Sequence, residues 1–99
     1  MKETYHYYNH YTSTKEAIPG KVYLVEAGGN SFLVHHPVGF DGRACNGWVI
    51  TERTTGRRAE GGFNTLREAK GRIAELDEYA HTQIKRRVEA RLYQLNTSL

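Results

Sequence analysis

Cationic side chains gather in two clusters along this sequence, and both clusters could bind anions. The first consists of Arg53, Arg57 and Arg58 in the middle of the chain. Guanidinium groups bind carboxylates and phosphates through paired hydrogen bonds, so this cluster is a candidate for contacting nucleic acid or an acidic protein surface. The alternative is an edge strand that is protected by its charge.

The second cluster lies near the carboxyl end and consists of Lys85, Arg86, Arg87 and Arg91. On a helix Arg87 and Arg91 would share one face, and no carboxylate is spaced to neutralise both. The alternative is a solvated helix face, which is where charged residues usually lie. We expect Arg87 and Arg91 to belong to the functional surface, because like charges at this spacing repel each other unless an anion joins them.

The amino end is rich in tyrosine, with Tyr7 and Tyr8 at its centre. Tyrosine is enriched at protein interfaces because it offers a large contact area at low entropic cost. The same side chains could instead fold back over the rest of the chain. We treat Tyr7 and Tyr8 as candidate partner-binding residues.

Signals for catalysis are weak. Cys45, together with Asp41 and His35 or His36, offers the residue types of a thiol nucleophile and its base, but their order matches no catalytic signature. The sequence therefore predicts no catalytic residue and a protein that is not an enzyme.

Signals for a metal or cofactor are equally weak. His6 and His10 would lie one helical turn apart, yet no carboxylate or cysteine accompanies them at ligand spacing. The glycines in 39–47 lack the Gly-Lys-Ser/Thr ending of a phosphate-binding loop. We predict no metal site and no cofactor.

Length and composition favour one small domain. The 99 residues, with 38% hydrophobic and 25% charged residues and a formal net charge of +3, predict a single folded domain over 1–99 with an anionic partner. The single Cys45 cannot form an intramolecular disulfide, and no apolar run is long enough to span a membrane. We expect a cytoplasmic protein without a membrane partner.

The first two thirds of the chain predict a β-rich region. Residues 1–20 form the least regular stretch, a Tyr/His-rich segment that could be an arm, an edge strand or a short helix. Residues 21–63 contain β-rich runs separated by glycine-rich turns, which predict an antiparallel sheet. Its strands are expected at 22–25, 32–34, 48–51 and, more weakly, 57–60, the last of these ending at Gly61-Gly62.

The last third, 65–95, predicts helix. Thr65-Leu66-Arg67-Glu68 is a capping box, in which the Thr hydroxyl and the Glu carboxylate bind first-turn N–H groups. An unbroken helix would be about 45 Å long, which is long for so small a domain. The apolar stripe also changes direction, so we expect a bend between Tyr79 and Thr82. The fold class is α+β: a three- or four-stranded antiparallel sheet with a long or bent carboxy-terminal helix, or two helices, packed on one face.

The second half of this helical region carries apolar residues beyond what a small sheet can cover. An exposed apolar stripe favours a partner, so we expect self-association as a homodimer. The residues concerned are Ile84, Val88, Leu92 and Leu95.

One part of the chain resembles a known kind of protein. The order of a strand, a turn, a strand and a capped helix over 47–69 resembles a unit that recurs in small proteins of phages and mobile elements. It is carried by Gly47-Trp48-Val49-Ile50-Thr51-Glu52, Thr55-Gly56, Gly62-Phe63-Asn64-Thr65 and Glu68-Ala69.

A small, cysteine-poor chain of this kind without a catalytic motif is similar to anti-CRISPR proteins. The resemblance implies a phage protein that inhibits a host defence complex, CRISPR-Cas, by occupying a surface in the host cytoplasm. Anti-CRISPR proteins that imitate DNA are acidic, whereas this chain is basic, so its partner would be an acidic protein patch or the guide RNA of a ribonucleoprotein complex. The alternative is a small basic nucleic-acid-binding or regulatory protein.

Overall fold

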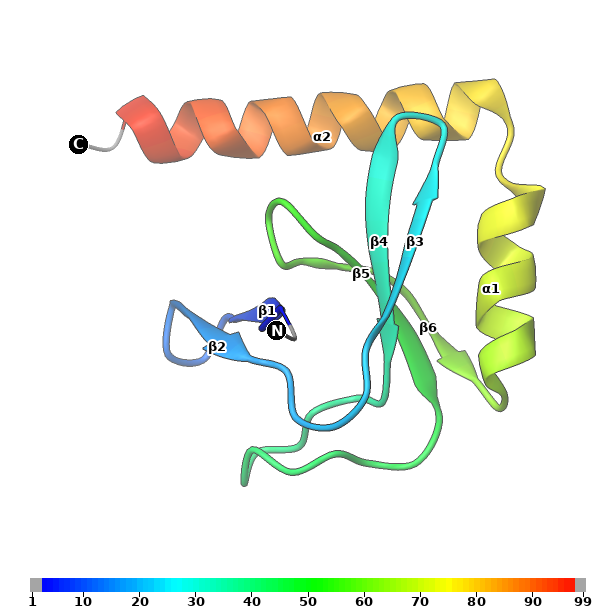
Figure 1. Ribbon diagram of the computed structural model, residues 1–99. Helices are drawn as coiled ribbons and strands as arrows, with labels where there is room; N and C mark the ends of the chain where they lie inside the picture. The colour runs from blue at the N-terminus through cyan, green and yellow to red at the C-terminus, as the bar shows by residue number, and fades with distance from the viewer. Residues whose placement is uncertain (1–2, 98–99) are drawn as a thin grey trace.

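The protein combines two antiparallel sheets with two carboxy-terminal helices, as a computed structural model shows for residues 3–97, with side chains described to residue 94 (Figure 1). This confirms the predicted α+β class. The strands are β1 (His6–Asn9), β2 (Thr14–Ala17), β3 (Tyr23–Ala27), β4 (Asn30–His35), β5 (Trp48–Glu52) and β6 (Arg58–Phe63), and the helices are α1 (Leu66–Glu75) and α2 (Glu78–Thr97).

The main sheet has the order β3-β4-β5-β6, with every neighbouring pair antiparallel. The first two strands match those predicted at 22–25 and 32–34, and they form a hairpin joined at Gly28-Gly29, where both residues have positive φ. The predicted fourth strand is present, but its predicted end is wrong: it begins at Arg58 and continues through the two glycines to Phe63. Its pairing with β5 is irregular, and Gly62 adopts a φ of 83°, a conformation that glycine tolerates without strain.

Strand β4 is buried on both of its faces. Phe32 and Val34 belong to the hydrophobic core that is completed by Ile73 of α1. Because side chains alternate along a strand, Leu33 and His35 point to the opposite face, and they are equally buried. Figure 1 shows why: α1 packs on one side of the sheet, and the amino-terminal hairpin lies on the other.

The helical region divides earlier than predicted. Helix α1 starts at the predicted capping box, where the Thr65 hydroxyl accepts from the Glu68 N–H and the Glu68 carboxylate accepts from the Asn64 N–H. It ends at Glu75, and Leu76 is extended. The expected bend between Tyr79 and Thr82 is therefore wrong. Asp77 accepts a hydrogen bond from the Ala80 N–H at 2.8 Å and so caps a new helix.

The amino-terminal segment is also more regular than an arm. Strands β1 and β2 form a hairpin, in which the Glu16 carboxylate accepts hydrogen bonds from Tyr7 and Asn9 at 3.0 Å each. The hairpin contacts the β5–β6 turn, because the Tyr8 N–H donates to the Gly56 carbonyl at 2.7 Å and Lys15 donates to the Thr54 carbonyl.

Helix α2 crosses one end of the sheet and continues past it (Figure 1). Within residues 3–97, neither helix is both long enough and apolar enough to cross a membrane.

We expect Thr65→Ala to lower the free energy of unfolding by about 1 kcal/mol, because a first-turn N–H of α1 loses its acceptor. Thr65→Ser keeps the hydroxyl and should stay close to the wild type. Urea melts of the three proteins measure this, and an unchanged midpoint for the alanine variant would show that the cap does not stabilise α1.

Gly28→Ala should destabilise the fold more than Gly20→Ala. Both glycines have positive φ, so both substitutions strain the backbone, but a Cβ at position 28 would lie 2.2 Å from the buried His81 ring, whereas nothing lies within 4 Å of one at position 20. We expect an additional loss of about 1–3 kcal/mol for Gly28→Ala. Equal melting curves for the two variants would contradict this.

Candidate functional site

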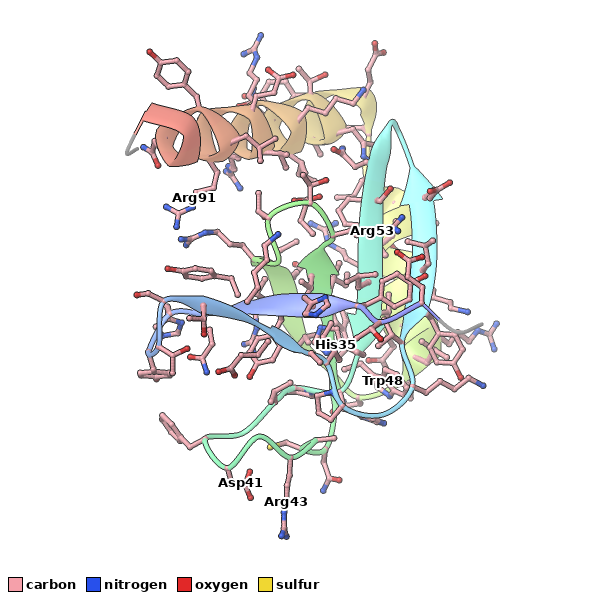
Figure 2. All side chains as sticks on the ribbon, turned by 60° about the vertical axis from the view of Figure 1, so that its left-hand side comes forward. His35, Asp41, Arg43, Trp48, Arg53 and Arg91 are labelled. Atoms are coloured by element: carbon pink, nitrogen blue, oxygen red, sulfur yellow. The ribbon has the colours of Figure 1, made fainter. Side chains whose placement is uncertain are left out.

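The structure brings the two arginine clusters together on one tyrosine ring. Arg57, next to β6, places its Cζ 4.6 Å from the centroid of the Tyr8 ring, and Arg91 of α2 places its Cζ at 5.4 Å. Figure 2 shows Arg91 pointing from α2 toward the amino-terminal hairpin. Three elements that are distant in the sequence therefore meet at Tyr8.

The charges at this site lack an acidic partner within the described part of the chain. Among the described side chains, Arg57, Arg58 and Arg91 make no ion pair with a carboxylate. Each cation–π contact contributes about 0.5–1 kcal/mol at an exposed site, and two guanidinium groups that contact one ring also repel each other. An anion bound here would remove that repulsion, so the site favours phosphate or carboxylate groups.

A buried carboxylate fixes the turn that carries Arg57. Glu52 is 5% exposed, and its side chain accepts from the Thr54 N–H, the Thr55 N–H and the Thr55 hydroxyl at 2.8–2.9 Å. The turn also approaches β1 closely, because a Cβ at Gly56 would lie 2.8 Å from the Tyr8 nitrogen. The backbone on both sides of the cation–π contact is thus held in place before any partner binds.

Arg53, which was nominated with Arg57 and Arg58, has a different environment. It forms an ion pair with Glu3 and lies over the ring of Tyr5 at 5.4 Å. These contacts connect the amino end of the chain to the sheet, and the charge of Arg53 is already compensated by Glu3. Arg57 and Arg58 have no such carboxylate among the described side chains, so they can bind an external anion.

Of the second cluster, only Arg91 enters the site. Lys85 lies beside the β3–β4 turn, where its Nζ would be 2.5 Å from a Cβ at Gly29. Arg86 and Arg87 are exposed, and Arg87 does not join Arg91 at Tyr8. Ile84, Val88 and Arg91 lie on the face of α2 that turns toward the rest of the chain. Arg86 and Arg87 lie on its exposed side.

The nominated oligomerisation residues have mixed surroundings. Ile84 packs against the hydrophobic core, Val88 is half-buried and Leu92 is 38% exposed. The side chain of Leu95 lies outside the described residues. The homodimer stays a prediction, which within the described residues rests on Val88 and Leu92.

A groove lies beside Tyr8, between the amino-terminal hairpin, the loop after β4 and the sheet. Its volume is about 720 Å³. Residues 7–12, including the nominated Tyr7, form one wall; 37–40 form the opposite wall, and His35, Val49 and Thr51 lie at the sheet. Figure 2 shows His35 in the body of the protein and the loop with Asp41 and Arg43 projecting beyond it.

Two aromatic side chains that the sequence analysis missed belong to this groove. Tyr11 and Phe40 come from its two walls, and their ring centroids lie 4.9 Å apart. They are 70% and 90% exposed. Tyr11 belongs to the nominated Tyr-rich segment, but nothing in the spacing of Phe40 indicated that the two loops meet.

His35 lies at the bottom of the groove in the neutral form. Its Nδ1–H donates to the His36 carbonyl at 2.8 Å, so its Nε2 accepts from the Thr51 hydroxyl at 2.7 Å. Burial lowers the pKa of His35; the hydrogen bond to the His36 carbonyl opposes this shift, and the charge of Arg58 adds to it.

The residue types of a thiol nucleophile do not assemble into a catalytic arrangement. Both ring nitrogens of His35 are engaged, the Nδ1 of His36 is hydrogen-bonded to the Gly47 carbonyl, and the exposed Cys45 thiol lies 3.9 Å from the Arg43 carbonyl. In the described part of the chain, no group of three His, Cys, Asp or Glu side chains is placed to hold a metal ion.

A second basic and aromatic surface lies near the other end of the sheet, and sequence reasoning missed it. Lys21 and Lys70 place their Nζ atoms 5.0 and 4.7 Å from the centroid of the Tyr23 ring. Tyr23 contacts Trp48, which in turn stacks with His36 at 4.1 Å. The β-rich run that predicted a strand at 22–25 does not reveal that α1 brings Lys70 to the same ring.

No family model matches this chain, and no curated protein or solved structure is significantly similar to it. Its function is therefore inferred from its own residues.

The pKa of His35 predicts a loss of stability in acid. Above about pH 6.5 the ring is neutral in both states; below it the unfolded chain takes up a proton that the buried ring does not, so the free energy of unfolding decreases as the pH falls toward the folded-state pKa. His35→Gln should reduce this pH dependence by about 1.4 kcal/mol for each unit of the pKa shift.

Urea melts between pH 7.5 and 5 measure this effect. His6→Gln, at an exposed position, is the control. The explanation fails if both variants keep the pH dependence of the wild type, or if both lose it equally.

Proposed function

We propose that this protein is a non-enzymatic binding protein that occupies exposed, single-stranded RNA in a ribonucleoprotein complex. In the setting that the sequence resemblance implies, it is a phage or mobile-element protein that inhibits a host defence complex of the CRISPR-Cas kind by covering its guide RNA in the host cytoplasm. The observation that carries the proposal is the Tyr8 ring shared by Arg57 and Arg91, two guanidinium groups without an acidic partner among the described side chains.

The combination of cations with aromatic rings favours a single strand over other anionic partners. Arg57, Arg58 and Arg91 have no carboxylate partner among the described side chains, and phosphates can pair with them. Unpaired bases offer flat faces on which tyrosine rings can stack. In an RNA duplex the bases are stacked and the major groove is too narrow for side chains to read, so exposed rings would gain little there. The ring of Tyr11, which is 70% exposed, thus fits an accessible, unpaired base, while Tyr8 holds the two arginines beside it.

Inhibition by occupancy follows from what the site offers. It presents charge and ring surface, while the polar groups of His35 are engaged within the protein. Bound RNA would be covered by this surface. The alternative function, a small nucleic-acid-binding or regulatory protein, uses the same residues and differs only in its target.

We expect the double variant Arg57→Gln/Arg91→Gln to bind single-stranded RNA at least tenfold more weakly than the wild type. Losing two phosphate contacts should also reduce the slope of log affinity against log salt by about 1.4, since each contact contributes about 0.7 on a single strand. Fluorescence anisotropy with a labelled 20-nucleotide RNA at several salt concentrations measures both quantities.

The matched control is Arg86→Gln/Arg87→Gln, which removes the same charge from exposed positions of α2. It should change the affinity less than threefold. Equal losses in the two double variants would mean that net charge alone causes binding.

A reconstituted CRISPR-Cas complex tests the biological part of the proposal. The wild type should inhibit its cleavage and Arg57→Gln/Arg91→Gln should not. RNA binding without inhibition would favour the regulatory alternative. Inhibition without any RNA binding would identify an acidic protein patch as the partner.

A further inference from the structure

We infer that the groove between the amino-terminal hairpin and the loop after β4 is a binding site for one unstacked nucleotide, with its base against Tyr11 and Phe40 and its phosphate on Arg57 and Arg58. This inference rests on the proposed function, because it assigns a specific part of the bound strand to a specific part of the surface.

The described lining of the groove is cationic and aromatic and contains no carboxylate. Arg57 and Arg58 lie at the β6 side, and Tyr7, Tyr8, Tyr11 and Phe40 supply rings from the two walls. The nearest acidic group of the hairpin, Glu16, already accepts hydrogen bonds from Tyr7 and Asn9. A ligand that complements this lining carries negative charge and a flat apolar face, and a nucleotide has both.

The two exposed rings are placed for stacking. Tyr11 is contacted by His10, with ring centroids 4.3 Å apart, and by Phe40 at 4.9 Å. A ring that is 90% exposed, as Phe40 is, contributes little to the core, since most of its surface stays in water. A stacked base would cover that surface, and base–aromatic stacking is a main source of affinity for single strands.

The groove has the size of a small-ligand site. Its volume of about 720 Å³ lies within the ~300–1,000 Å³ of ordinary ligand pockets. It therefore suits one nucleotide unit of a longer strand, with the neighbouring phosphates left to Arg91 and the rest of the basic surface.

The floor of the groove predicts weak discrimination between bases. The ring nitrogens of His35 are committed to the His36 carbonyl and the Thr51 hydroxyl, and Val49 beside them is apolar. Selecting one base requires hydrogen-bonding groups directed at the edge of that base. Neither ring nitrogen of His35 is available for this, because both are hydrogen-bonded within the protein. The site should accept pyrimidines and purines through their ring faces.

The experiment compares an 8-nucleotide oligouridylate with an abasic oligomer of the same length and charge. Phe40→Ala should weaken binding of oligouridylate about tenfold and leave binding of the abasic oligomer unchanged, because only the base stacks on the ring. Since Phe40 is 90% exposed, this variant should fold as the wild type does.

Tyr79→Ala is the control, because it removes an aromatic ring that is 72% exposed on α2, outside the groove. It should leave both affinities unchanged. Oligoadenylate and oligouridylate should also bind the wild type within about threefold of each other.

The outcomes separate this inference from the proposed function. If Phe40→Ala binds oligouridylate as the wild type does, while Arg57→Gln/Arg91→Gln is impaired, the groove assignment is wrong and the RNA-binding function stands. An equal loss for Tyr79→Ala and Phe40→Ala also overturns the assignment. If the wild type binds neither oligomer at low salt, both proposals are wrong.

Discussion

The site depends on the hydrogen bonds that the buried carboxylate of Glu52 accepts. By accepting three hydrogen bonds from Thr54 and Thr55, it holds the β5–β6 turn in one conformation. The Gly56 carbonyl of that turn accepts from the Tyr8 N–H, so the amino-terminal hairpin is positioned by the same turn. A buried carboxylate with an unsatisfied oxygen would be costly, and in this conformation the turn supplies hydrogen bonds to both oxygens of Glu52. The position of Arg57 beside Tyr8 follows from that constraint.

Strand β4 connects this site to the hydrophobic core. Its alternating side chains place Phe32 and Val34 in the core with α1, and Leu33 and His35 on the opposite face, where His35 lines the groove. The hairpin is thus part of the folded domain, because it covers a sheet face that would otherwise expose apolar surface to water. The two faces of the sheet then differ in role, since α1 stabilises one face and the other face carries the groove.

Local signals predicted the fold better than the site. The Gly28-Gly29 turn, the strand runs and the Thr65 cap depend on residues close in sequence, and the structure confirms them. The sequence left the amino-terminal segment open between an arm, an edge strand and a short helix, because the side-chain bonds that hold its hairpin converge on Glu16, whose role no local pattern shows. The change in direction of the apolar stripe did not locate the helix break, because Asp77, a good N-cap residue, starts α2 before that change. The contacts of Arg57 and Arg91 with Tyr8 depend on tertiary packing. The sequence therefore identified these residues as candidates but did not predict that they lie side by side.

The arginines of this chain show why neighbouring charges of the same type differ in function. Arg53 has Glu3 and Tyr5, so its charge is compensated inside the protein. Arg57 and Arg91 both contact the ring of Tyr8, which attracts each of them weakly. The tight β5–β6 turn and the packing of Ile84 on the core position the elements that carry them. An anion at this position would therefore be attracted by both guanidinium groups.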